Sequence, residues 1–417
     1  MQSVIIGKNQ AGQRLDKFLH KCLPLAGNGF LYKMLRKKNI TLNGKKAEGG
    51  EILAPGDQVR FFLSDETFCR FSGNISREMP AEGSGGMPQR GSGERPGAGE
   101  VPGETEPKYV PDGKGRTGLD GKHPEIPGRI PDKTRSGKNV PDRAEYERAF
   151  RILQGITVLY EDEDCVIVDK PSGILSQKAA PGDVSLNEWL IGYLLLQDPS
   201  LEKDLPTFRP SVCNRIDRNT SGIVLCGRSL PGLQYLNAGI RERRIRKFYR
   251  TICVGAVREA GEIEGCLTKS GTRNRVSISR SSGQFGAAAP GGGKASPIRT
   301  AYRPIFATDD FTLLEVELIT GKSHQVRAHL ADIGHPVIGD AKYGQESVNR
   351  ILRKEYGLST QLLHACRVTF PESVSGPGRA LGGRSILAPC PELFRRIEAG
   401  LFSSVSGTGK GNDTGKG

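Results

Sequence analysis

A single carboxylate stands between two guanidinium groups in the segment 214–222. Asp217 is flanked by Arg215 and Arg218 on a short polar turn, and the apolar run 223–226 that follows predicts a buried strand. An unpaired carboxylate is costly to bury, so Asp217 must find cationic or backbone partners, which would keep it ionised and lower its pKa. A fixed, ionised carboxylate can act as a nucleophile or a base. For an isolated aspartate, however, a turn residue paired with structural arginines is the simpler interpretation.

Two later segments contain side chains that suit the same chemistry. Tyr249 begins a strand-like run at 249–254, where it could equally be a core aromatic residue whose hydroxyl is satisfied. The segment 318–330 is typical of a strand, a tight turn and a helix. It places Arg327 beside the apolar face of that helix, where the guanidinium group can reach inward at the turn. A glycine-punctuated loop follows at 334–344.

Two alternative chemistries are not supported by the spacing of these residues. The tripeptide 321–323 looks like the end of a phosphate-binding P-loop, but that motif needs a glycine where this chain has Val316. His324 and His329 are five residues apart and therefore lie on different faces of a helix, which does not suit zinc. Both are interpreted as surface or supporting histidines, and no metal site is predicted.

The composition favours a polyanionic partner. The 417 residues are enough for two or three domains, and a hydrophobic content of 36% predicts a substantial unstructured part. The formal net charge of +14 favours nucleic acid. Nine cysteines without a C-x-x-C pair are typical of free thiols in a reducing compartment. Because no apolar run approaches membrane-spanning length, we expect a cytoplasmic protein with no membrane partner.

Composition also divides the chain into four parts. Residues 1–71 are predicted to form a compact basic module, and 148–402 a large mixed domain. Between them, 72–147 is dense in glycine, proline and charge. Such a segment cannot bury enough apolar surface to offset its ordering entropy, so a disordered linker is predicted. A disordered tail is predicted at 403–417.

The N-terminal module has the pattern of a small α/β domain. Helices are predicted around 14–19 and 30–38, followed by a strand and an Asn-Gly turn at 40–45. A charged helix face can be merely solvated, but here two elements contribute to one basic surface: Lys33, Arg36, Lys37, Lys38, Lys45 and Lys46. With GQRLDKFL, ITLNGKK and LAPGDQVRFFL, residues 12–65 resemble the RNA-binding domain of the ribosomal protein S-four type. This resemblance implies contact with structured RNA through phosphates and shape.

The large domain is expected to belong to the α+β class. Two β-rich runs at 156–160 and 165–169, separated by an acidic turn, predict a hairpin. Further strands are predicted at 223–227, 249–255, 311–319 and 366–370, and helices near 186–196, 232–243, 324–333 and 391–399. Strands outnumber helices and do not alternate strictly with them, so we expect a mixed, largely antiparallel sheet.

Three motifs in this order, NRIDRNTSGIVLCGRS, KFYRTICVG and LITGKSHQVRAHLADIGHPVIGDAKYG, strongly resemble the RluA-type pseudouridine synthases. LLHACRVTF is similar to the closing strand of that family, and the resemblance covers about 156–372. It implies an RNA-modifying isomerase with four site residues. Asp217 is then the catalytic aspartate, Arg215 helps to displace the target base, Tyr249 stacks on the uracil and Arg327 pairs with Asp217.

The resemblance also implies the reaction. Converting uridine to pseudouridine moves the ribose bond from a ring nitrogen to ring carbon 5, which requires no metal, nucleotide or redox cofactor, so we expect none. The base must leave the stack to be reached, which suits an inserted arginine and an aromatic platform. Asp217 would act either as a nucleophile at the anomeric carbon or as a base at the adjacent carbon. Arg327 would keep it ionised and oriented, and Tyr249 could assist removal of the proton from carbon 5.

Two departures from the family pattern concern substrate and surface. Asn214 stands where the family often has histidine, and the glycine-rich insertion 281–296 would lengthen a surface loop. A non-catalytic RNA-binding protein with the same fold is the main rival interpretation, but the intact site residues argue against it. A metal-dependent nuclease is disfavoured because the sequence has no carboxylate cluster. The basic module favours large-subunit ribosomal RNA over transfer RNA as the partner, and we expect a monomer.

Overall fold

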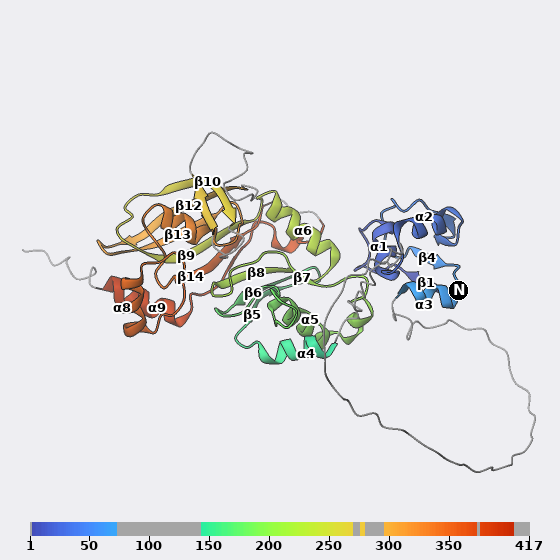
Figure 1. Ribbon diagram of the computed structural model, residues 1–417, viewed down its shortest axis with the longest axis horizontal. Helices are drawn as coiled ribbons and strands as arrows, with labels where there is room; N and C mark the ends of the chain where they lie inside the picture. Colours follow the sequence, from blue (N-terminus) through green and yellow to red (C-terminus); the bar gives the residue numbers. More distant parts are fainter. Residues whose placement is uncertain (1, 73–142, 270–275, 280–295, 373–375, 404–417) are drawn as a thin grey trace, which may run out of the picture. The chain divides into compact units, whose positions relative to one another are not determined.

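The computed structural model describes residues 2–72, 143–269, 276–279, 296–372 and 376–403 (Figure 1). Most of the predicted linker, the predicted tail beyond Ser403 and almost all of the glycine-rich insertion lie outside these ranges. No helix within the described ranges is long and apolar enough to cross a membrane. The N-terminal module and the large domain are described separately below.

The N-terminal module is a small α/β unit built on a four-stranded sheet. Its strands are ordered β1-β4-β2-β3 and all pair antiparallel: β1 (Gln2–Ile5), β2 (Ile40–Leu42), β3 (Lys45–Lys46) and β4 (Gln58–Phe61). Three helices accompany it: α1 (Leu15–Cys22), α2 (Asn28–Arg36) and α3 (Asp65–Ser72). Leu15, Phe18 and Leu19 are fully buried, which confirms the predicted inward face of the first helix.

The turn between β2 and β3 explains why its sequence is Asn-Gly. Asn43 has φ 52° and Gly44 has φ 72°, so both residues are in the left-handed region. A two-residue hairpin turn with both φ values positive matches the twist of the flanking strands and favours Asn-Gly. The predicted hairpin is therefore confirmed, and it projects Lys45 and Lys46 into solvent.

Helices extend into the segment that was predicted to be a linker. Ser72 is the last residue of α3 and is buried, and α4 (Arg143–Ile152) begins five residues before the predicted start of the large domain at 148. Tyr146 of α4 is also buried, against the side chains of Ile191 and Leu195. The linker prediction is therefore wrong for Ser72 and 143–147. Although the sequence of α4 is highly charged, the few apolar side chains on one face of the helix pack against the domain and stabilise it.

The large domain is organised around one mixed sheet. Among the described residues it has 11 strands, nine of them in the order β11-β10-β12-β13-β9-β14-β8-β6-β5, while β15 pairs with β14 and β7 with β8. The pairing of β14 with β8 is parallel, and the other pairs of this sheet are antiparallel, as predicted. The strands are β5 (Thr157–Glu161), β6 (Cys165–Lys170), β7 (Ser211–Val212), β8 (Ser221–Gly227), β9 (Arg246–Val254), β10 (Gly261–Lys269), β11 (Val276–Ser279), β12 (Ser296–Ala307), β13 (Phe311–Leu318), β14 (Leu363–Thr369) and β15 (Ser385–Leu387).

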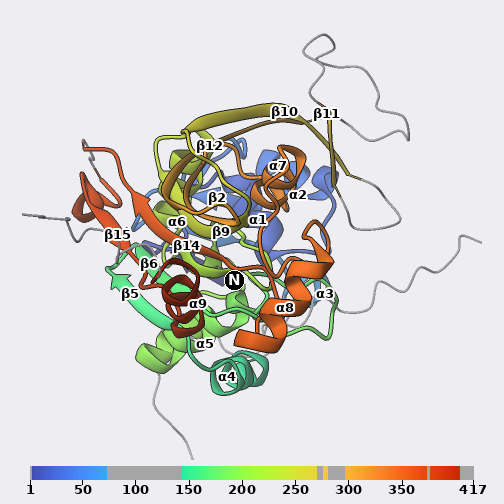
Figure 2. The same cartoon turned by 90° about the vertical axis from the view of Figure 1, so that its left-hand side faces the viewer.

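Helices pack beside this sheet. They are α4, α5 (Leu186–Gln197), α6 (Leu230–Arg241), α7 (Gln325–Asp332), α8 (Glu346–Tyr356) and α9 (Glu392–Phe402), with short 3-10 turns at Pro199–Lys203 and Arg379–Leu381. Figures 1 and 2 both show α8 beside α9. The four predicted helices and the predicted hairpin are confirmed, whereas α4 and α8 were missed.

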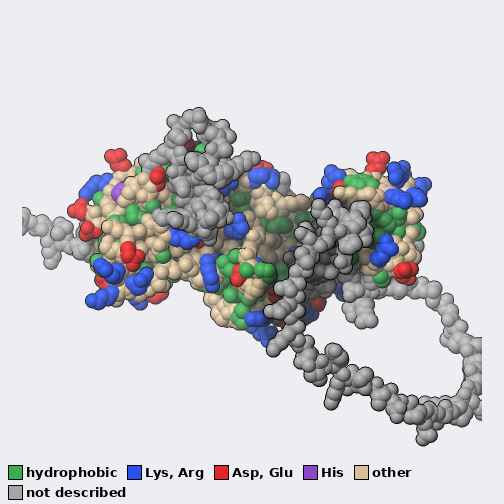
Figure 3. Space-filling model, viewed as in Figure 1, with side chains coloured by type: hydrophobic (Ala, Val, Ile, Leu, Met, Phe, Trp, Pro, Cys, Tyr) green, Lys and Arg blue, Asp and Glu red, His purple; other side chains and the backbone are tan. Residues whose placement is uncertain are grey.

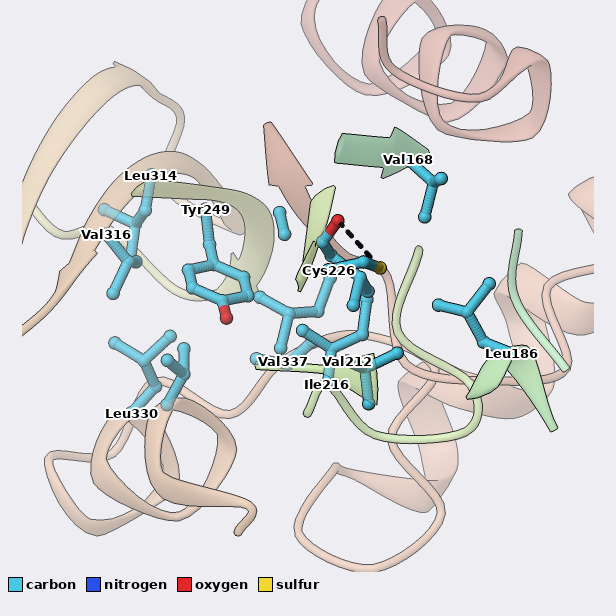
Figure 4. Close-up of a cluster of buried hydrophobic side chains, with 14 of the residues drawn as sticks. Val168, Leu186, Val212, Ile216, Cys226, Tyr249, Leu314, Val316, Leu330 and Val337 are labelled. Atoms are coloured by element: carbon cyan, nitrogen blue, oxygen red, sulfur yellow. Dashed lines mark hydrogen bonds between the residues drawn. The ribbon is translucent and has the colours of Figure 1, made fainter. Parts of the chain in front are cut away.

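The centre of the sheet is covered on both faces. In β6, Val166 and Val168 point into one apolar cluster, whereas Cys165 and Ile167 point into another. Because successive side chains of a strand point to opposite faces, a strand buried on both faces needs a continuous apolar run rather than an alternating one. The first of these clusters reaches Tyr249 and the inner face of α7 (Figure 4). This part of the core therefore lies directly beneath the candidate site described below.

Candidate active site

Asp217 lies in the turn between β7 and β8, at the start of the most completely buried strand of the sheet. The backbone N–H of Thr220 donates to the Asp217 carbonyl at 3.0 Å and closes the turn. Gly222 has φ 111°, and a Cβ there would lie 2.3 Å from the carbonyl oxygen of Ala365 on β14. Only glycine allows β14 to approach β8 this closely, so the glycine of the motif fixes the strand that carries the turn.

Arg327 holds two carboxylates at once. It is almost completely buried on α7, and its Nη1 donates to Asp217 Oδ2 at 2.8 Å. Its Nε and Nη2 donate to Asp340 Oδ2 and Oδ1 at 2.7 and 2.8 Å. The two bonds to Asp340 fix the plane of the guanidinium group, which leaves Nη1 directed at Asp217. The expected pairing of Asp217 with Arg327 is thus present, with a second carboxylate that the sequence analysis did not identify.

Asp340 is the buried anchor of this arrangement. Its side chain is 0% exposed, and its Oδ1 also accepts the backbone N–H groups of Lys342 and Tyr343 at 2.8 and 3.2 Å. Burial alone would raise the pKa of Asp340, but the hydrogen bonds and charge of Arg327 lower it below its ordinary value. The sequence did contain a signal for this role. Asp340 closely follows an apolar pair in the glycine-punctuated loop, and a carboxylate buried beside apolar residues needs a cationic partner.

Tyr249 lies on β9 with its ring in the apolar core and its edge at the site. It is 5% exposed and packs in the cluster that contains Leu314, Val316 and Leu330 (Figure 4). It also lines a cavity together with Asp217. Burial, and then the charge of Asp217, raise the pKa of Tyr249 well above its ordinary value, so its hydroxyl is protonated at neutral pH. Both interpretations left open by the sequence therefore apply: the tyrosine is a core residue and a site residue.

The site opens into a cavity of about 560 Å³. Asp217, Tyr249 and Arg215 line this cavity, and the same three side chains line a smaller cavity of about 40 Å³ that reaches Arg327. Asp217 is 23% exposed, whereas Arg215 is exposed at the mouth. A pocket of several hundred Å³ is of the size that holds a small-molecule-sized group such as one nucleotide. The geometry thus brings together all four residues that the resemblance implied.

A buried lysine supports the turn from behind. Lys170 is fully buried at the end of β6, and its Nζ donates to the carbonyls of Pro171, Ile174 and Arg218 at 2.9, 2.9 and 3.1 Å. Three acceptors match the three N–H bonds of an ammonium group. Burial lowers the pKa of Lys170 to about 7, and the charge of Asp217 opposes this shift. Lys170 therefore ties the loop after β6 to the turn that carries Asp217.

Histidine side chains near the site are held by protein groups. His324 has φ 58° and precedes α7, where its Nδ1 lies 3.1 Å from the Tyr343 hydroxyl. His329 is fully buried on α7, with its Nδ1 2.8 Å from Thr300 Oγ1. The interpretation of both as supporting residues agrees with these contacts. Over the ranges that the structure describes, no group of His, Cys, Asp or Glu is placed to hold a metal ion.

The predicted RNA-binding side chains belong to the N-terminal module. They are exposed on α2, at its C-terminal end and on the β2–β3 turn: Lys33, Arg36, Lys37, Lys38, Lys45 and Lys46. Figure 3 shows basic side chains on the surface of this module. None of the six has a side-chain hydrogen bond or ion pair with another described residue, so their charges are available to a partner.

Comparison with known proteins identifies the large domain. Residues 164–332 match the family model described as RNA pseudouridylate synthase. The ribosomal large subunit pseudouridine synthase D of Xanthomonas campestris is 30% identical over 59% of this chain and 69% of the relative. The synthase D of Haemophilus ducreyi is 25% identical over 60% and 74%. The chain belongs to the RNA pseudouridylate synthase family. It is therefore an isomerase that converts uridine to pseudouridine in RNA, and the expected RluA-type membership is confirmed.

Two further proteins are also similar to this chain. An uncharacterised RNA pseudouridine synthase of Chloroflexus aurantiacus is 33% identical over 50% of this chain and 59% of the relative. The human RNA pseudouridylate synthase domain containing 4 has a TM-score of 0.45 at 20% identity, over 60% of this chain and 94% of its own. The matched range of the pseudouridylate synthase family includes Asp217, Tyr249 and Arg327 but ends before Asp340.

Proposed function

We propose that this pseudouridine synthase modifies uridines of large-subunit ribosomal RNA and uses Asp217 as its catalytic carboxylate. The observation that carries the second part is the placement of Asp217. It is the carboxylate among the residues that line the cavity of about 560 Å³, and Arg327 holds it at 2.8 Å. An ion pair at the edge of a cavity orients the carboxylate while its other oxygen remains available to a substrate.

The geometry is compatible with both roles of the carboxylate. A carboxylate oxygen of Asp217 can add to the anomeric carbon as the bond to the ring nitrogen breaks, or it can take a proton from the adjacent ribose carbon. In either case, the freed uracil must turn so that carbon 5 can bond to the anomeric carbon. Formation of this bond breaks the bond to Asp217 in the first route, or is accompanied by return of the ribose proton in the second, and the proton on carbon 5 must then leave. The cavity of about 560 Å³ lies within the size range of pockets that hold small molecules, which leaves room for a base to turn.

Arg215 and Tyr249 are proposed to position the target base. Arg215 is exposed at the cavity mouth, where an inserted guanidinium group can occupy the place that the displaced uridine leaves in the stack. Tyr249 lines the same cavity and offers a rigid aromatic surface for the uracil. Its hydroxyl is protonated at neutral pH, so any part it takes in removing the carbon-5 proton requires loss of its own proton first.

Large-subunit ribosomal RNA is proposed as the substrate for two reasons. The relatives from Xanthomonas and Haemophilus are named for the ribosomal large subunit. In addition, the N-terminal module carries an exposed basic surface on the scaffold that resembles the S-four type of RNA-binding domain, which we propose it to be. Phosphate contacts by such a surface position a protein on folded RNA without reading its sequence.

One complementation experiment tests both parts of the proposal. Cells that lack the gene are supplied with the wild-type protein or with Asp217→Asn, and pseudouridine is mapped in their RNA. We expect the wild type to restore one or more large-subunit positions and Asp217→Asn to restore none. The variant nearly preserves shape, and Asp340 still neutralises Arg327, so it should fold and bind RNA normally. Restoration by Asp217→Asn would refute the catalytic assignment, whereas restoration only in another RNA would refute the substrate.

A further inference from the structure

A second buried lysine faces the cavity beside Asp217. Lys247 is only 7% exposed, yet it lines the cavity of about 560 Å³. It lies on β9 two residues before Tyr249, and alternate residues of a strand point to the same face. Phe248, between them, points to the opposite face, where it packs against the guanidinium groups of Arg246 and Arg367. The strand therefore presents a cation and the proposed uracil platform side by side.

The ammonium group of Lys247 lacks a protein partner. Among the residues that the structure describes, none forms a hydrogen bond or ion pair with it. The position is nevertheless confined, because a Cβ added at Gly321 would lie 3.5 Å from Lys247 Nζ. Burial lowers the pKa of Lys247, and no carboxylate offsets that shift. Lysine is almost never buried without a partner, so the group is suited to an anion that arrives with the substrate.

The charges around the cavity select the kind of anion. Arg215, Arg218, Lys247 and Lys322 line it, against the single carboxylate of Asp217. Arg218 Nε donates to the carbonyl of Gly173, which leaves its charge unneutralised. An excess of cations around one nucleotide-sized space matches a phosphodiester strand that passes its mouth. Lys247 is set deeper than the exposed Arg215 and Lys322, so it can contact only a phosphate close to the displaced nucleotide.

We propose that Lys247 binds a phosphodiester group that flanks the target uridine and thereby holds the nucleotide against Asp217 and Tyr249. This inference rests on the proposed function of the site, because it needs RNA to enter the same cavity. Lys247 acts in it as a substrate-binding residue. The alternative is a structural lysine whose side chain fills the space next to Gly321, and this alternative predicts no effect of the charge on RNA binding.

Lys247→Met keeps the methylene chain and removes the charge. The probe is a short oligouridylate, tested intact and with one phosphate at a time replaced by a neutral methylphosphonate. We expect Lys247→Met to bind the intact probe about tenfold more weakly, as for loss of one charge-assisted hydrogen bond, and to flatten the salt dependence by about 0.7 in log-log slope. Lys354→Met, which removes an exposed lysine of α8, should change neither.

The methylphosphonate series locates the contact. At one position of the probe, the methylphosphonate should weaken binding to the wild type by about the same factor as Lys247→Met does. The same methylphosphonate should not weaken binding to Lys247→Met any further, because the interaction it removes is already absent. If every substitution weakens the variant as much as the wild type, or if the variant binds the intact probe normally, the inference is wrong. Thermal unfolding of Lys247→Met serves as the folding check, because removal of a buried unpaired charge should not lower its midpoint.

A measurement on the wild-type protein covers the case in which Lys247→Met does not fold. Acylation of Lys247 by an amine-reactive ester is followed by mass spectrometry. The intact probe should protect the lysine, and the methylphosphonate at the contacted position should not. Unchanged labelling with the intact probe would overturn the inference. Failure of the proposed substrate is distinguishable, because ribosomal RNA would then lack the expected pseudouridine while oligouridylate binding still depended on Lys247.

Discussion

Replacing Arg327 should damage folding as well as catalysis, because Arg327 neutralises Asp340 in addition to Asp217. In Arg327→Met, the Asp340 carboxylate stays fully buried and keeps only the backbone N–H groups of Lys342 and Tyr343. Breaking a buried ion pair from one side costs about 3–5 kcal/mol. A domain has roughly 5–15 kcal/mol of folding stability in total, so this loss is large. Asp217, being 23% exposed, can be hydrated and should contribute much less to the loss.

The double variant Arg327→Met/Asp340→Asn separates the two effects. The amide oxygen that replaces the carboxylate can still accept from the two backbone N–H groups, and no buried charge remains. We expect chemical denaturation to show recovery of at least about 1.5 kcal/mol over Arg327→Met, as for a coupled pair. Release of tritium from RNA labelled at uridine carbon 5 should remain abolished in both variants, because Asp217 has lost its cation. Arg353→Met, at an exposed position on α8, is the control.

Acidification provides an independent check on the same pair. In the wild type, Arg327 lowers the pKa of Asp340 below 3.8 in spite of burial, so the stability that it contributes is present above that value and is lost as the pH falls further. In Arg327→Met, burial raises the pKa of Asp340 and only the two backbone N–H groups oppose it, so protonation relieves the cost at a higher pH than in the wild type. The stability gap between wild type and variant should therefore narrow from pH 7 to pH 4. A constant gap, or a double variant no more stable than Arg327→Met, would refute the assignment of Asp340.

Two further predictions concern the supports of the site and the N-terminal module. Lys170→Met should lower the unfolding free energy by about 2 kcal/mol or more, because the carbonyls of Pro171 and Ile174 lose the ammonium donor, while that of Arg218 keeps the backbone N–H of Gly173. Activity should fall with stability, since the lysine also ties down the turn that carries Asp217. An unchanged denaturation midpoint would contradict this. Replacing Lys33, Lys37 and Lys45 with glutamine should weaken binding to ribosomal RNA and flatten its salt dependence, with single-turnover rates at saturating RNA unchanged. If replacing Arg350, Arg353 and Lys354 of α8 with glutamine weakens RNA binding equally, the N-terminal module has no specific role in binding.

The site residues that could be predicted from sequence are those whose neighbours along the chain already indicate their role. Asp217 between two arginines before an apolar run already predicts a carboxylate held at the edge of a buried strand, and the structure places it there. The hairpin of β5 and β6 was also predictable, because two apolar runs flank an acidic turn. Helices α5, α6, α7 and α9 were predictable because their apolar residues recur at helical spacing. Helix α8 was missed because its 11 residues are mostly polar and expose all but a narrow face.

The supporting groups could not be predicted, because their partners meet only in the folded chain. Asp340 reaches Arg327 because the glycine-punctuated loop returns across α7, and nothing in the spacing of 13 residues requires that return. Lys170 donates to the carbonyl of Arg218, which is 48 residues away along the chain. Lys247 could have been noticed by its two-residue spacing from Tyr249, but its burial without a partner is a property of the tertiary structure.

The floor and the mouth of the candidate site carry opposite charge. Asp217, Arg327 and Asp340 together carry one net negative charge, because a single guanidinium group neutralises two carboxylates. Breaking a glycosidic bond develops positive charge on the ribose, which a net negative floor would stabilise in either of the two roles proposed for Asp217. The exposed mouth has the opposite sign, through Arg215, Arg218 and Lys322. Under the proposed function, the cations of the mouth attract the phosphodiester strand while its ribose meets Asp217. Reversing the charge of the mouth would then oppose binding, and reversing that of the floor would oppose the chemistry.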